Sequence, residues 1–282
     1  ANFDEIPLPK MPKESENKAA WFVFREFCGL EFVTFIAEKA RVVAQADPRR
    51  RPSGSQASCA DIFMPNFTSV APLDFEDLIN IAFADQTEFG CDAYSTEDYF
   101  CGCDMDYLLS LMNGRRLVNN EWNVHGQDPR ITARSYWTQI GKGLKGIFAL
   151  TMQQPADNWQ SSMWALLNPD FTPHAKLGAI ADTNHEVHRL ERLLAPAKPS
   201  PFVKPVAFYY SRLDLSLPQP TFGSYDCSID SPYRIYAVLR GLGYPVRWIT
   251  PRQIEAGVLK DVGAVAMIGV KYVPAEAAKK LA

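Results

Sequence analysis

The sequence contains no uninterrupted apolar run approaching the length of about 20 residues that a membrane-spanning helix needs. We therefore expect no membrane insertion. Acidic and basic side chains nearly cancel, because 32 acidic and 29 basic residues leave a formal net charge of −3. That balance gives no electrostatic reason to expect binding to nucleic acid or to an anionic membrane surface. The part of the chain after residue 205 has no G-x-G-x-x-G run to cradle a phosphate, and we predict no cofactor.

Cysteine is sparse, and its six positions are spread over the chain at 28, 59, 91, 101, 103 and 227. This number is too low for a small fold held together by disulfides, and it favours a cytoplasmic protein, with secretion as the alternative. The pair Cys101 and Cys103 differs from the C-x₂₋₄-C spacing of zinc sites. His185 and His188 are three residues apart, as on the surface of a helix. We predict no metal site, and the polar, proline-rich first residues do not resemble a signal peptide.

What the sequence does contain is a large apolar fraction, 47%, with 12% aromatic residues, as in a globular protein with a substantial core. Helical periodicity alternates with short apolar runs that are typical of buried strands. We predict helices over 17–46, 74–84, 96–114, 128–143 and 168–194, and strands over 50–58, 88–95, 115–122 and 144–152. Four such alternations indicate parallel βα units, which place functional side chains at the C-terminal ends of the strands.

A linker with four prolines in eleven residues follows at 195–205. Beyond it the alternation resumes. We predict strands over 206–211, 245–250 and 263–270, and helices over 231–243, 251–259 and 274–282. The helix over 231–243 is expected to start with Ser231 as its cap and Pro232 in its first turn. Three strands are too few for a finished doubly wound sheet, so this region is predicted to be a partial α/β domain.

Four segments together carry a resemblance to a known family: FDEIPLPKMP, RRLVNNEWNVHG, SYWTQIGKGLKGIFALTMQ, and KPVAFYYSRLDLS followed by YAVLRGLGYPVRWIT. In sequence and in order they resemble glycoside hydrolase family 42, the β-galactosidase-like enzymes. The resemblance implies that residues 1–194 form strands 5–8, the C-terminal half, of a (β/α)8 TIM barrel. Residues 195–205 would then be a linker, and 206–282 a partial flavodoxin-like or amidotransferase-like domain that mediates trimers. The first half of the barrel would come from another chain or segment.

Glu121 is the candidate catalytic residue. It ends a predicted barrel strand, and the resemblance implies that it is the nucleophile of a retaining β-glycosidase with a carbohydrate substrate. Retaining hydrolysis needs a second carboxyl group about 5–5.5 Å away as acid/base; the resemblance places that group upstream of residue 1. Asn119 and Asn120 are expected to donate hydrogen bonds to Glu121, and Trp122 to shield it from water.

Sugar sites combine aromatic faces with polar groups that fix the hydroxyls. The candidates near the predicted strand ends are Asn120, Trp122, Trp159, Trp164, Asp92, Tyr94 and Gln153. For Trp164 the alternative is packing in the barrel rim. Glu88 and Asp92 are expected either to contact substrate or to pair with a neighbouring arginine.

The segment ALTMQQPADNWQSSMW departs from the resembled family, which usually has a tryptophan near the end of the eighth strand and a downstream glutamate and histidine that hold the sugar. Galactose specificity therefore stays open. One alternative is a non-catalytic carbohydrate-binding or assembly protein that kept the barrel. Another is an unrelated α/β enzyme whose element pattern imitates a barrel.

Overall fold

The computed structural model of the protein describes most of the chain, and the predicted strand over 50–58 lies outside the described residues except for Arg51. The described residues are 18–49, 51, 74–84, 88–91, 98–123, 128–153, 164–194, 203–210, 212 and 227–282. Among them, no helix is both long enough and apolar enough to cross a bilayer.

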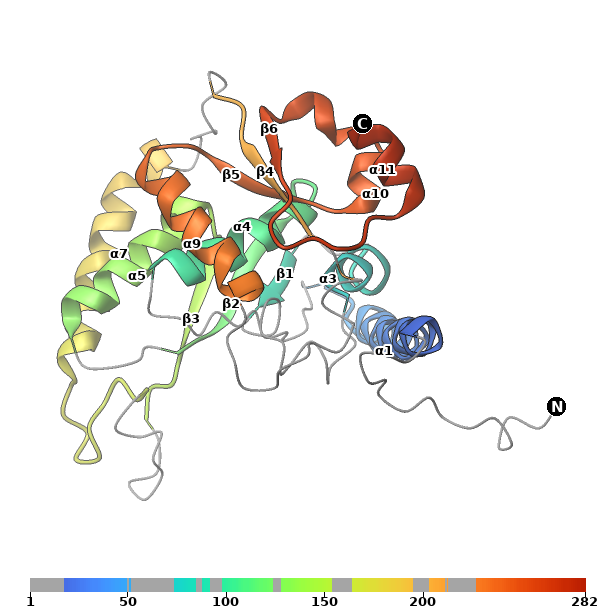
Figure 1. Cartoon of the computed structure of the whole chain (residues 1–282). Coiled ribbons are helices and arrows are strands. Elements are labelled where there is room, and N and C mark those ends of the chain that lie inside the picture. Colours follow the sequence, from blue (N-terminus) through green and yellow to red (C-terminus); the bar gives the residue numbers. More distant parts are fainter. Residues whose placement is uncertain are drawn as a thin grey trace.

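The first sheet is parallel, with its strands in chain order β1-β2-β3. Its strands are β1 (Glu88–Cys91), β2 (Arg116–Asn123) and β3 (Gly146–Leu150), and the helices α4 (Asp98–Leu111), α5 (Pro129–Lys142) and α7 (Ala175–Leu194) follow them in turn. Figure 1 shows α5 and α7 side by side on one face of the sheet. The predicted βα alternation is confirmed for these strands.

Helix α5 illustrates how the sequence sets these boundaries. The Asp128 side chain accepts a hydrogen bond from the backbone N–H of Arg130, and Pro129 occupies the first helical turn. Gly143 ends the helix with φ of 96°, a conformation that a side chain would make costly. Both ends agree with the prediction for 128–143.

Among the described residues, two helical segments precede β1. The first is the long α1 (Lys18–Ala46), as predicted. The second begins as α3 (Phe75–Asp77) and continues as a π-helical turn, Leu78–Ala82. Its first turn is acidic, and Asp74 caps it by accepting hydrogen bonds from two backbone N–H groups. The predicted helix over 74–84 is confirmed in type, with a wider turn in its second half.

The second sheet is also parallel, in the order β5-β4-β6. Its strands are β4 (Val206–Tyr209), β5 (Val246–Ile249) and β6 (Ala264–Ala266). The helices described in this region are α9 (Cys227–Gly241), α10 (Pro251–Glu255), a 3₁₀ turn (Val258–Asp261) and α11 (Ala275–Leu281). Thr250 and Gln253 form a capping box at the start of α10. The placement of the first strand between the other two matches a flavodoxin-like beginning.

Two predicted helix starts are wrong. Helix α7 begins at Ala175 and not at 168, because Pro173 disfavours helical angles at the residue before it; residues Asn168 to Phe171 form a turn instead. Helix α9 begins at Cys227, so Ser231 is not its cap and Pro232 lies inside it. An internal proline removes one backbone hydrogen bond, and we attribute its tolerance here to the packing of α9 against α4 described below.

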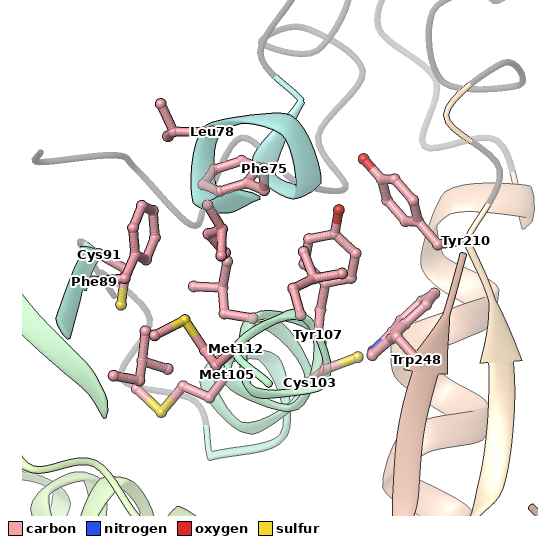
Figure 2. Packing of buried hydrophobic residues seen from close by; sticks show 14 of the residues in the cluster. Phe75, Leu78, Phe89, Cys91, Cys103, Met105, Tyr107, Met112, Tyr210 and Trp248 are labelled. Atoms are coloured by element: carbon pink, nitrogen blue, oxygen red, sulfur yellow. The ribbon is translucent and has the colours of Figure 1, made fainter. Parts of the chain in front are cut away.

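Helix α4 lies between the two sheets and supplies the centre of a single continuous core. Figure 2 shows Met105 and Met112 near Phe89 of β1. On the other side of α4, the Tyr107 ring lies 4.5 Å from the Tyr210 ring and 6.0 Å from the Trp248 ring, measured between centroids. Each such aromatic pair stabilises the fold by about 0.5–1.5 kcal/mol beyond the area it buries, so the two sheets are joined by packing.

Hydrogen bonds from α9 reinforce this junction. The Tyr233 hydroxyl donates to Asp104 on α4 at 2.9 Å, and burial raises the pKa of that carboxyl well above its usual range. The Tyr236 hydroxyl donates to Asp106 at 2.8 Å and accepts from Lys142, which also pairs with Asp106. These polar groups are thus satisfied across the junction, as buried polar groups must be to avoid a large desolvation cost.

A charged cluster closes the same junction near α3. Arg212 pairs with Asp74, and it lies 3.1 Å from a Glu26 oxygen and 3.7 Å from an Asp77 oxygen. Arg252 also pairs with Asp77. Arg212 is 18% exposed and Arg252 is 57% exposed, so Arg212 holds the buried part of the cluster.

Candidate functional site

Glu121 lies near the C-terminal end of β2, the central strand of the first sheet, and is partly buried. The register of β2 against β3 changes directly around it. Asn119 pairs with Ile147, whereas Trp122 pairs with Ala149. Three steps along β2 therefore match two along β3, so β2 contains a bulge of one extra residue at Asn120 and Glu121. Bulges of this kind are frequent next to active sites, where they redirect a side chain.

The residues on either side of the bulge both face α5. Asn119 is fully buried, and its Nδ2 donates to Oε1 of Gln139 at 2.8 Å. The Trp122 indole N–H donates to the Ser135 hydroxyl at 3.3 Å, and the Trp122 ring lies 5.3 Å from the Tyr136 ring. The bulge thus begins and ends on the helix side of the sheet.

Asn120 occupies the opposite side of the sheet, away from the helices. A Cβ built on Gly90 of β1 would lie 1.7 Å from Nδ2 of Asn120, so the Asn120 amide lies directly over this glycine. A Cβ on Gly146 of β3 would lie 3.1 Å from Val118 on the same side. In a closed barrel this side of the sheet is the interior, and the bulge presents the Asn120 amide there at the C-terminal end of β2.

The other predicted site residues are brought together only in part. Gln153 and Trp164 are described and partly buried, whereas Asp92, Tyr94 and Trp159 lie outside the described residues. Glu88 pairs with Arg116 at 3.0 Å, which confirms the arginine-pairing alternative for this residue.

Trp122 differs from the expectation. Its ring is 1% exposed and packs on the helix side, because the bulge reverses the alternation that would have turned it inward. The sequence reasoning also missed Gln139 and Ser135, which hold the strand from α5. The available signal was Asn119 itself, a polar residue at a position where the alternation of β2 calls for an apolar one.

Cys91 and Cys103 are core packing groups, and His188 is a surface group. Cys91 and Cys103 are buried free thiols, and burial is the largest cause of a Cys103 pKa well above its usual value. His188 lies 3.9 Å from Glu191 on exposed α7. Within the described part of the chain, no group of three or more His, Cys, Asp or Glu residues is placed to hold a metal ion.

Comparison with solved structures identifies the architecture. The chain superposes on a β-galactosidase from the psychrophilic Marinomonas ef1 with a TM-score of 0.72, at 17% identity, covering 99% of this chain and 45% of that one. A polyextremophilic β-galactosidase from the Antarctic haloarchaeon Halorubrum lacusprofundi gives 0.71 and 16%, covering 97% and 42%. A family 42 β-galactosidase from G. stearothermophilus gives 0.65 and 12%, covering 87% and 38%.

The chain therefore has a glycoside hydrolase fold. More narrowly, its architecture is that of the family 42 β-galactosidases: the C-terminal half of a TIM barrel followed by a partial flavodoxin-like α/β region. It spans less than half the length of each of these three enzymes. No protein-family model matches the sequence. No curated protein matches it either.

Proposed function

We propose that this chain is part of a retaining β-glycosidase of the β-galactosidase type, and that Glu121 forms the covalent glycosyl-enzyme. The observation that supports this most is the bulge, which sets Glu121 at the C-terminal end of the central strand, where barrel enzymes place catalytic groups. In such a mechanism the Glu121 carboxylate attacks the anomeric carbon as the aglycone departs, and water then cleaves the new ester bond.

The acid/base carboxyl group belongs, in this proposal, to a preceding segment or second polypeptide that supplies the other half of the barrel. Phe148 supports such a partner. It lies on the side of β3 away from the helices and is 61% exposed. The long α1 also carries exposed apolar side chains, including Phe27 and Phe35. A half-barrel packed here would cover this apolar surface.

We also propose the boundaries 1–194 for the partial barrel, 195–205 for the linker and 206–282 for the second domain, with the second domain mediating a homotrimer. The substrate in this proposal is a carbohydrate with a terminal β-glycosidic bond. Asn120, Gln153 and Trp164 are proposed to contact the sugar, together with the partly exposed face of the sheet around Glu121.

Covalent trapping tests the proposed chemistry. The protein carrying a complete barrel is incubated with a 2-deoxy-2-fluoro-β-galactoside that has a good leaving group, and its peptides are analysed by mass spectrometry. We expect one fluoroglycosyl group, attached to Glu121, because fluorine slows hydrolysis of the glycosyl-enzyme. Sugar binding without any adduct would instead identify a carbohydrate-binding protein. An adduct on another carboxylate would overturn the assignment of Glu121.

Replacing Gly90 by alanine tests the proposed role of Asn120. The new methyl group would occupy the place of the Asn120 amide, which would move aside because it ends a flexible side chain. We expect KM to rise about tenfold, since one lost hydrogen bond costs about 0.5–1.5 kcal/mol. Steady-state kinetics measure this effect. Gly146→Ala is the matched control, because Gly146 faces the same side at the far end of β3; an equal rise in KM there would contradict the prediction.

A further inference from the structure

A buried pair of amides lies behind the proposed nucleophile, on the helix side of β2. Leu117 is buried on this side by the alternation of β2, and Trp122 is buried there because of the bulge, but Asn119 between them is polar and fully buried. Its partner Gln139 on α5 is fully buried as well. Burying two amides in an apolar layer costs free energy, and departures from a local rule concentrate at functional sites.

The hydrogen-bonding groups of this amide pair are only partly satisfied, so the pair costs stability. Asn119 Nδ2 donates to Gln139 Oε1 at 2.8 Å. Gln139 Nε2 is buried and makes no hydrogen bond within the described residues. A leucine pair of similar volume would fill the same space without this cost. Packing alone therefore does not account for the two amides.

The amide oxygen of Asn119 gives a reason for the two buried amides. Its Oδ1 accepts a hydrogen bond from the backbone N–H of Glu121 at 3.2 Å. An extra residue in a bulge loses its regular ladder partner, and asparagine often replaces that partner by bonding to the backbone two residues onward. Asn119 thus connects α5, through Gln139, to the backbone of the residue that is proposed to attack the sugar.

We propose that Asn119 and Gln139 are positioning residues for Glu121. Gln139 fixes the orientation of the Asn119 amide, and Asn119 fixes the backbone of the bulge and thereby the direction of the Glu121 carboxylate. Neither amide touches the substrate, because both lie on the helix side. The inference rests on the proposed nucleophilic role of Glu121.

The first test compares substitutions of Asn119 in the protein with a complete barrel. Asn119→Leu removes the acceptor, and we expect kcat to fall about 10²-fold, the loss that a displacement of about 1 Å can cause, with little change in KM. Asn119→Asp keeps an acceptor for the Glu121 N–H, and the Gln139 amide can turn its Nε2 toward the new carboxylate. We therefore expect it to recover most of the lost kcat. Equal kcat values for the two variants would overturn the proposal.

A double variant separates positioning from stability. Asn119→Leu leaves the Gln139 amide buried without a partner and should lower Tm. Adding Gln139→Leu removes that amide, so Tm should recover. If Asn119 positions Glu121, kcat stays low in the double variant, because the acceptor is still missing. If the pair only stabilises the fold, kcat recovers together with Tm, and the proposal fails.

Two further measurements keep this inference distinct from the proposed function. If the original protein forms no adduct with the fluoroglycoside, the proposed function fails and the inference falls with it. If Glu121 is labelled at the same rate in the original protein and in Asn119→Leu, only the positioning role fails.

Should Asn119→Leu not fold, Gln139→Leu replaces it. This variant keeps the Asn119 acceptor but no longer fixes the orientation of the Asn119 amide, and we expect labelling of Glu121 to be about tenfold slower. Unchanged labelling would overturn the inference.

Discussion

Glu121→Gln in the protein with a complete barrel should lower turnover of an aryl β-galactoside by about 10⁴-fold or more, a range seen when a covalent nucleophile is lost. Glutamine has the shape of glutamate but cannot form the glycosyl ester. Folding should be preserved, since the side chain is only partly buried and the backbone bond to Asn119 does not involve the carboxylate. Steady-state kinetics and circular dichroism measure the two effects.

Glu88→Gln is the matched control for this substitution. Glu88 lies on the neighbouring strand β1, where it forms an ion pair with the 60% exposed Arg116. Exposed pairs contribute about 0–1 kcal/mol, so turnover should stay within about threefold of the original. Residual activity above about a tenth in Glu121→Gln, with normal folding, would refute the nucleophile assignment.

Arg212→Met should produce the largest loss of stability at the junction between the two sheets. Methionine fills part of the space but leaves Asp74 and Glu26 without their cation. Removing one partner of a buried charge pair costs about 3–5 kcal/mol, because the remaining charge has lost its solvation. Urea unfolding followed by tryptophan fluorescence measures the free energy of unfolding, with Trp248 in the affected core.

The control is Arg252→Met, which removes a cation from the same cluster at a site that is 57% exposed. We expect a loss below about 1 kcal/mol, since water screens this charge. Equal losses in both variants would contradict the distinction between the buried and the exposed arginine.

The loss in Arg212→Met should also depend on pH. Burial raises the pKa of Glu26 above its ordinary value of 4.5, and Arg212 opposes that rise. Without Arg212 the folded-state pKa of Glu26 increases further. A carboxyl group with a raised folded pKa lowers stability as pH rises through the unfolded value to the folded one. The difference between the variant and the original should therefore widen above about pH 4.5, and a constant difference would argue against this cause.

Local signals in the sequence were sufficient to predict the helices and strands around the site. The Asp128–Pro129 start of α5 and the apolar runs of β2 and β3 depend on neighbouring residues only, and the structure confirms them. The starts of α7 and α9 were less predictable, because a proline is compatible with more than one helical boundary.

Features that depend on register or on distant pairs could not be predicted. The bulge at Glu121 exists only relative to β3, so no count along β2 alone finds it or the packing of Trp122 on the helix side that follows from it. Arg212 meets Asp74 across 138 positions in the chain. Nothing in the local sequence of residues 74–77 (DFED) indicates that the arginines that pair with its carboxylates come from the region of the second sheet.

The position of α4 also constrains how relatives of this protein can diverge. The helix packs against β1 on one side and against β5 on the other. A substitution of Tyr107 or Met105 therefore changes the packing of the core that both sheets share. Helices α5 and α7 pack against each other and against β2 and β3, and α5 also contacts α4. We expect the sequence of α4 to diverge more slowly among relatives than the sequences of α5 and α7. We also expect the C-terminal region to be inherited together with this barrel and not to be exchanged as a separate domain.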